Sequence, residues 1–199
     1  RVNDLPSALS ANCCVARLIQ GSVFATLSSA MGPSPDRTCA SDFSKTIGIL
    51  RDKDFSPEQI RDTKLVFIPN PNNPTGSLFG AAELARFVAA LPERVVLFLD
   101  DAYVDFQEGA DAPDTIAVLR ARPRTIVARG FSKAYGMSGL RLGYGVSSLE
   151  LAGWLRKVHR PFAVDRLAFV AGLAALFAFE HLQRTGQVVR EGRAFLPAA

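Results

Sequence analysis

Apolar residues along this chain form short continuous runs that alternate with segments of helical spacing. The runs cover residues 64–70, 94–100, 124–130 and 140–146, and turn-forming or charged residues bound them. Continuous apolar runs of this length are typical of strands that are buried on both faces, as in parallel sheets. The pattern therefore predicts four strands.

Helical spacing fills the segments between and after these runs. One helix is expected after Ser77 as its N-cap, a short one over residues 114–121, and a third opened by Ser147. Residues 165–185 predict one long helix that ends at Gly186. The apolar face of the first helix comprises Leu84, Phe87, Val88 and Leu91, and Pro92 stops it.

Strands that alternate with helices predict an α/β fold, in which a mostly parallel sheet lies between helices in a three-layer α/β/α arrangement. Residues 54–199 carry this pattern. Residues 1–53 show no clean hydrophobic period and form a separate N-terminal part that matches the pattern poorly. The longest apolar run, Leu167 to Phe179, is too short to span a bilayer and predicts a buried helix. No membrane association is expected.

Charge and cysteine usage narrow the class of protein. Among 199 residues, 23 basic and 19 acidic side chains are interspersed and give a net charge of +4, so nucleic acid is not an expected partner. Cys13, Cys14 and Cys39 have neither the pairing of a disulfide framework nor zinc-ligand spacing, and only His159 and His181 could add imidazoles. We expect no metal site, and a reducing, cytoplasmic location.

Polar residues of several chemical types follow the ends of the predicted strands. In an open α/β sheet, ligands bind outside the carboxyl ends of the strands. Taken singly, each residue has an ordinary explanation as a turn former, an acidic helix start or a surface lysine. Together they form a set with an amide, a carboxylate, a phenol, a hydroxyl, an amine and a guanidinium: Asn73, Asp100, Tyr103, Ser132, Lys133 and Arg141.

One cofactor uses this whole set. Pyridoxal phosphate forms a Schiff base with a lysine and requires a carboxylate against its pyridine nitrogen. Its phenolic oxygen requires hydrogen-bond donors, and its phosphate requires a cation with hydroxyl or backbone donors. The residue types at the strand ends therefore predict a pyridoxal phosphate site.

Three stretches carry a resemblance to a known family: PNNPTG at 71–76, LDDAYVDF at 99–106 and SKAYGMSGLRLGYG at 132–145. They resemble the large domain of fold-type I (class I/II) aminotransferases and, within them, the histidinol-phosphate aminotransferases. The resemblance runs from about residue 54 to the end. It implies a large-domain fragment that is incomplete at both ends, with the C-terminal small domain of the family absent.

The resemblance also implies a role for each residue of the set. Lys133 is implied as the Schiff-base lysine and as the base that moves a proton between substrate and cofactor. Asp100 is implied to pair with the protonated ring nitrogen, which keeps the ring an electron sink. The remaining implied contacts are Asn73 and Tyr103 at the phenolic oxygen, and Ser132 and Arg141 at the phosphate.

The implied activity is the transfer of an amino group between an amino acid, or a phosphorylated amino compound, and a 2-oxo acid. Histidinol phosphate is the first candidate for the amino compound. The resemblance also implies a homodimer if the chain is complete. The chain departs from the family at Gly130, where a hydroxyl residue is common, and near Arg37, where an aromatic ring stacks on the cofactor. Two alternatives stay open: a truncated remnant that at most binds the cofactor, and a relative such as threonine-phosphate decarboxylase. The chain has no G-x-G-x-x-G after a strand, which disfavours a nucleotide-binding Rossmann protein.

Overall fold

The computed structural model describes residues 13–20, 63–159 and 161–196. The expected boundary between residues 53 and 54 and the departure near Arg37 lie outside the described residues.

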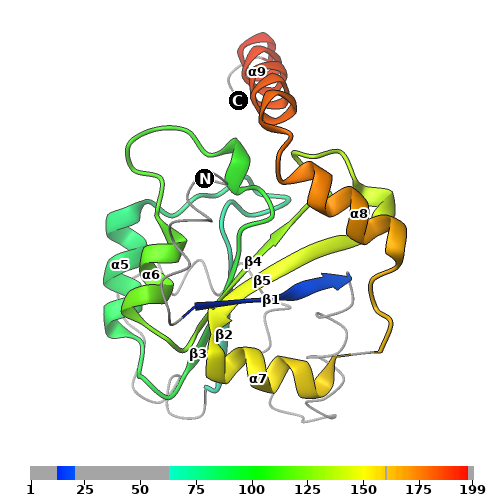
Figure 1. Ribbon diagram of the computed structural model, residues 1–199. Coiled ribbons are helices and arrows are strands. Elements are labelled where there is room, and N and C mark those ends of the chain that lie inside the picture. The colour runs from blue at the N-terminus through cyan, green and yellow to red at the C-terminus, as the bar shows by residue number, and fades with distance from the viewer. Residues whose placement is uncertain (1–12, 21–62, 160, 197–199) are drawn as a thin grey trace.

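A five-stranded sheet forms the centre of the described part of the chain (Figure 1). Its strands lie in the order β1-β5-β4-β3-β2. Strands β2, β3 and β4 run parallel, whereas β5 is antiparallel to both β4 and β1. The strand bounds are β1 Cys13–Gln20, β2 Leu65–Pro69, β3 Val96–Asp100, β4 Thr125–Gly130 and β5 Leu142–Ser148.

The four predicted strands correspond to β2 to β5, and the predicted α/β class is confirmed. The sheet is mixed, because two of its four strand pairings are antiparallel. The parallel part comprises β2, β3 and β4, so the carboxyl ends of these three strands meet at one edge. That edge is where the candidate residues follow the strands.

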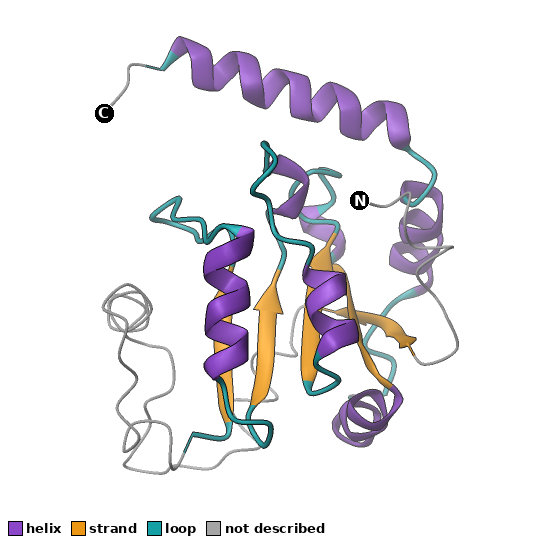
Figure 2. Cartoon of the chain, turned by 90° about the vertical axis from the view of Figure 1, so that its left-hand side faces the viewer, coloured by secondary structure: helices purple, strands orange, loops and turns teal. Residues whose placement is uncertain are grey.

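Helices surround the sheet. Figure 2 shows α5 and α6 in front of the strands, and α7 contacts β1 and β5. Helix α9 crosses above the carboxyl ends of the parallel strands in both views. The bounds are α5 Ala81–Ala90, η2 Val104–Phe106, α6 Thr115–Ala121, η3 Ser138–Leu140, α7 Leu149–Val158, α8 Arg166–Ala175 and α9 Phe179–Phe195.

Two of the predicted helix caps are wrong. The first helix begins at Ala81 instead of directly after Ser77, because the backbone N–H of Ala81 is satisfied by the distant Asp111. Ser77 instead shares a hydrogen bond with Thr75 in the preceding loop. The third helix is capped by Ser148, since β5 continues through residue 147 before the chain turns.

The predicted long helix over residues 165–185 is two helices. α8 ends at Ala175, α9 begins at Phe179, and the two are bent by 79°. Gly186 lies inside α9 and does not end it. Within the described residues no single helix is long and apolar enough to cross a membrane. Among these residues, only α8 and α9 taken together, with the bend between them, reach the required length and apolar composition.

Residues from the sheet, α5, α6 and α8 form one buried cluster. Helix α8 contributes only the face that carries its small residues, and Ala168 and Gly172 are among the buried positions on that face. The prediction that the run Leu167 to Phe179 is a buried helix is therefore wrong. Leu167 is 78% exposed and Phe177 is 77% exposed, because only one narrow side of α8 faces the sheet.

Candidate active site

The loops after β2 and β3 meet at the carboxyl edge of the sheet. Asn73 lies in the loop after β2, and Tyr103 lies three residues beyond the end of β3. The amide Nδ2 of Asn73 donates a hydrogen bond of 2.8 Å to the hydroxyl oxygen of Tyr103. Two of the predicted site residues, thirty positions apart in sequence, are thus in direct contact.

Lys133 joins this pair from the loop after β4. Its Nζ lies 4.9 Å from the centre of the Tyr103 ring, within the range of a cation–π contact. The loop is closed by two backbone hydrogen bonds of 2.9 Å, from Gly136 to the carbonyl of Lys133 and from Met137 to the carbonyl of Phe131. Gly136 has φ +69°, a conformation that glycine adopts without strain, and Phe131 is fully buried. The lysine is therefore held on a tight, anchored turn.

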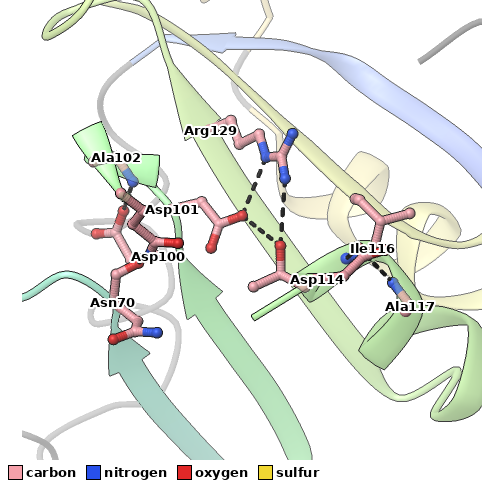
Figure 3. A network of polar contacts seen from close by, with 10 residues as sticks. Asn70, Asp100, Asp101, Ala102, Asp114, Ile116, Ala117 and Arg129 are labelled. Atoms are coloured by element: carbon pink, nitrogen blue, oxygen red, sulfur yellow. Dashed lines mark hydrogen bonds and ion pairs between the residues drawn. The ribbon is translucent and has the colours of Figure 1, made fainter. Parts of the chain in front are cut away.

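Asp100 is the last residue of β3 and lies beside the same loop. Its Oδ1 accepts a hydrogen bond of 3.0 Å from the backbone N–H of Ala102 (Figure 3). Burial raises the pKa of Asp100, and the Ala102 N–H and the positive charge of Lys133 partly oppose that rise. A partly buried carboxylate in this position gains from a cationic partner.

Ser132 and Arg141 occupy the same region of the chain. Ser132 is half-buried, and Arg141 is exposed. The guanidinium Nη1 of Arg141 donates to the carbonyl of Ser138 at 2.8 Å, and its backbone has φ 51°, an uncommon value for a residue with a side chain. Within the described part of the chain, no side-chain hydrogen bond or ion pair joins Ser132 or Arg141 to the other four site residues.

Residues that the sequence did not single out hold these loops together. Both side-chain polar atoms of buried Asn70, at the end of β2, bond the backbone of Phe79, at 3.1 Å and 2.8 Å. The backbone carbonyl of Asn70 accepts a hydrogen bond of 3.0 Å from the amide of Gln107, which follows η2. These bonds tie the Asn73 loop to the segment that carries Tyr103. Asn70 has the pattern of an ordinary turn former in the sequence, and Gln107 gives no signal.

Sequence reasoning also missed Asp101 and Arg129. Asp101 is 1% exposed, and its Oδ2 lies 3.1 Å from Nε of Arg129 on β4. Thr115, the first residue of α6, donates a hydrogen bond of 2.6 Å to the same oxygen. The only sequence signal was the doubled acid at positions 100 and 101, which does not say which acid faces which side.

The arrangement places a carboxylate, an amine and a phenol–amide pair at one edge of the sheet, with a hydroxyl and an exposed guanidinium nearby. Such a set can bind an anionic, planar group that also presents a cationic nitrogen. The amine can attack a carbonyl carbon, and it can afterwards move a proton.

Comparisons with known proteins agree with this chemistry. The sequence model of the aminotransferase class I and II family matches residues 38–196. A histidinol-phosphate aminotransferase of Pseudomonas fluorescens is 46% identical over 137 residues, which are 69% of this chain and 37% of the relative. An aromatic amino acid aminotransferase of Nocardia farcinica is 48% identical over 132 residues, which are 65% of this chain and 37% of the relative.

Among solved structures, the histidinol-phosphate aminotransferase of Sinorhizobium meliloti in complex with pyridoxal-5'-phosphate is similar, with a TM-score of 0.61 and 37% identity. The match covers 65% of this chain and 35% of that one. This chain therefore matches just over a third of the length of each of these proteins.

Proposed function

The chain belongs to the class I and II aminotransferase family, and from that membership we propose that its strand-end site holds pyridoxal phosphate and transfers an amino group to a 2-oxo acid. The observation that carries the proposal is the contact between Asn73, Tyr103 and Lys133 beside the partly buried carboxylate of Asp100. These residues come from three separate loops. Their convergence is what a single bound cofactor requires.

The donor set fits the cofactor group by group. The Asn73 amide and the Tyr103 hydroxyl lie 2.8 Å apart, so both can donate to one phenolic oxygen. The raised pKa of Asp100, which comes from burial, means that an adjacent cation would stabilise its ionised form. A pyridine nitrogen that carries a proton is such a cation.

When bound, the cofactor supplies an electron sink for the negative charge that develops at the substrate α-carbon. The chain supplies the rest. Lys133 would hold the cofactor through its Nζ and would be the base for the proton at the substrate α-carbon. Asp100 would hold the proton at the ring nitrogen, and Tyr103 would bind the phenolic oxygen.

Ser132 and Arg141 would hold the phosphate. The Arg141 guanidinium is exposed and its Nη1 bonds a single carbonyl, that of Ser138. A guanidinium has five N–H groups in a planar fork that matches two phosphate oxygens. In this proposal the phosphate would contact the segment that carries Ser132 and Arg141, and the ring nitrogen would contact the end of β3 at Asp100.

Histidinol phosphate is the amino donor that we propose, and 2-oxoglutarate is the acceptor for the assay. The name of the Pseudomonas fluorescens relative supports this donor. An aromatic amino acid is the second candidate, because the Nocardia farcinica relative is 48% identical and is named for that activity. A homodimer, as implied by the family resemblance, is part of the same proposal.

The test is to supply the chain with pyridoxal phosphate, 2-oxoglutarate and one donor at a time, and to measure glutamate. In an enzyme that carries this segment together with the remaining parts of a full-length relative, we expect glutamate with histidinol phosphate, and none from the matched Lys133→Ala variant. Faster formation with phenylalanine would favour the second candidate. Release of carbon dioxide from threonine phosphate, without glutamate, would replace aminotransfer by decarboxylation.

A further inference from the structure

A closed polar triangle lies next to Asp100, at the end of β3 (Figure 3). Its corners are Asp101, Arg129 and Thr115. Oδ2 of Asp101 lies 3.1 Å from Nε of Arg129 and accepts a hydrogen bond of 2.6 Å from Thr115, while Nη2 of Arg129 donates to the Thr115 hydroxyl at 3.3 Å. The Arg129 side chain is 10% exposed and that of Asp101 is 0% exposed. The triangle joins the end of β3 to β4 and to the start of α6.

The sequence alone does not say whether Asp100 or Asp101 faces the candidate site. Asp100 and Asp101 are adjacent and chemically identical, and consecutive residues of an extended chain point to opposite sides. In Figure 3, Asp101 reaches toward Arg129, whereas Asp100 lies beside Ala102 and turns away from the guanidinium. A shift of one residue at the end of β3 would exchange the two acids. Something must therefore determine which acid faces the site.

Stability alone gives a weak reason for the triangle. Burial raises the pKa of Asp101 to about 6, although Arg129 and Thr115 act to lower it. Its Oδ1 is buried and has no hydrogen-bond partner among the described residues. A buried ion pair whose desolvation exceeds its attraction adds little to the free energy of unfolding, and such pairs can instead specify geometry.

The charges that face Arg129 support a geometric role. Burial lowers the pKa of Arg129, but Asp101 and Tyr144 outweigh that effect and raise it overall, so the guanidinium stays charged. Burial raises the pKa of Asp105, on η2, and the charge of the Arg129 guanidinium partly opposes that rise. The charge of Lys133 acts on Asp100. Each of the two adjacent acids therefore has a cation of its own, Lys133 for Asp100 and Arg129 for Asp101.

We propose that Arg129 is a positioning residue for Asp100: its bonds to Asp101 and Thr115 fix the end of β3 so that Asp100, and not Asp101, faces the ring nitrogen of the cofactor. The inference rests on the proposed function, because the ring nitrogen belongs to that cofactor. Arg129 bonds Asp101 and Thr115, neither of which is a candidate site residue, so its proposed role is indirect. It acts through the strand end.

The decisive comparison is between Arg129→Met and Arg129→Lys. Methionine fills similar space but makes no ion pair, so the end of β3 loses its anchor and Asp100 its fixed direction. Lysine restores a cation that can pair with Asp101, but it has a single nitrogen in place of the two, Nε and Nη2, that Arg129 directs at Asp101 and Thr115. The matched control is Arg124→Met, directly before the same strand, because Arg124 is exposed and its guanidinium bonds the carbonyl of Arg94 at 3.4 Å, away from the triangle.

The experiment loads each protein with pyridoxal phosphate labelled with ¹⁵N in the ring and records the ring-nitrogen chemical shift and the cofactor Kd. We expect the wild type and Arg124→Met to show a protonated ring nitrogen. In Arg129→Met the signal should move toward the unprotonated position and Kd should rise about tenfold. Arg129→Lys should lie between them. A role that only stabilised the fold would lower the unfolding midpoint and leave the nitrogen signal of folded protein unchanged.

The outcomes distinguish the positioning role from the proposed function. If wild type binds the cofactor and folded Arg129→Met shows the same nitrogen shift and Kd, the positioning role is wrong and the proposed function stands. If Arg129→Met does not fold, the same measurement is made on Arg129→Lys, and a wild-type signal there overturns the inference. If the wild type itself takes up no cofactor, the proposed function fails and this inference fails with it.

Discussion

At the scale of single residues, Asp100 and Asp101 show how surroundings divide two identical side chains. Asp100 accepts a backbone hydrogen bond and lies near Lys133, whereas Asp101 is enclosed by Arg129 and Thr115. With Asp101 enclosed in this way, Asp100 is the acid that we propose for the ring nitrogen. The chemistry of an acidic pair therefore depends on the side of the strand to which each member points.

This division predicts opposite results for two amide substitutions. Asp100→Asn should lower transamination by about a hundredfold or more, because an amide cannot hold the proton at the ring nitrogen. Asp101→Asn should keep most of the activity, since its amide oxygen can still accept from Arg129 and Thr115. Steady-state turnover of the two variants is the measurement. Normal turnover by Asp100→Asn with loss in Asp101→Asn would assign the role to the other acid.

Asp101 also gives stability a dependence on pH. Its pKa in the folded chain is raised by burial from 3.8 to about 6, so the folded state binds this proton more tightly than the unfolded state. Its contribution to the free energy of unfolding is therefore present below about pH 4 and is lost as the pH rises through about 6. Urea unfolding between these values should show a steeper fall in wild type than in Asp101→Asn, where Asp100, whose pKa burial also raises, still contributes. A rise over that range in wild type relative to the variant would contradict the sign.

The sequence indicated the site residues to different degrees. The strand-end rule places Asn73, Asp100 and Tyr103 at one edge because each follows a strand whose apolar run is legible, and Asn73 and Tyr103 are found in contact. It could not place Arg129 or Gln107, because their partners are set by strand register and by a loop path. Those contacts join positions 28 and 37 residues apart in sequence.

At the scale of elements, strands were easier to predict than helix ends. The apolar runs determine β2 to β5 because burial on both faces leaves little freedom. Helix ends depend on distant partners: Asp111 satisfies the start of α5, and the sequence near Ser77 gives no sign of it. The single helix expected over 165–185 breaks because α8 packs on β5 while Arg190 and Arg193 of α9 bond the segment at and after η2.

The packing of α8 on β5 predicts a contrast between two glycines. A Cβ at Gly172 would collide with the side chain of Leu142, whereas a Cβ at Gly153 in α7 meets nothing within 4 Å. Gly172→Ala should therefore lower the free energy of unfolding by about 1–3 kcal/mol through overpacking. Gly153→Ala should raise it by up to about 1 kcal/mol, because alanine favours the helix. Equal effects in urea unfolding would show that α8 does not pack as described.

At the scale of the whole molecule, α8 carries apolar surface that the described part of the chain leaves uncovered. Its large side chains are exposed while its small ones face the sheet, and they include Leu167, Phe169, Val170 and Leu173. Contiguous apolar surface of this kind marks interaction sites in folded proteins. A second copy of the chain is the partner that the proposed homodimer supplies.

Self-association through this surface is measurable by sedimentation. We expect the wild-type chain to sediment as a dimer and the double variant Leu167→Glu/Val170→Glu to sediment as a monomer, because two charges would have to be desolvated at the interface. Glu150→Gln, on the exposed surface of α7, serves as the control. A wild-type monomer, or a variant that remains dimeric, would place the interface elsewhere.

The central claim is that pyridoxal phosphate attaches at Lys133, and covalent trapping tests it most directly. The chain has five lysines: Lys45, Lys53, Lys64, Lys133 and Lys157. After the chain is incubated with the cofactor, reduced with borohydride and digested, mass spectrometry should find the label on the peptide that carries Lys133, in proportion to the visible absorbance lost on reduction. Label spread over the other four lysines, with none on Lys133, would contradict the account.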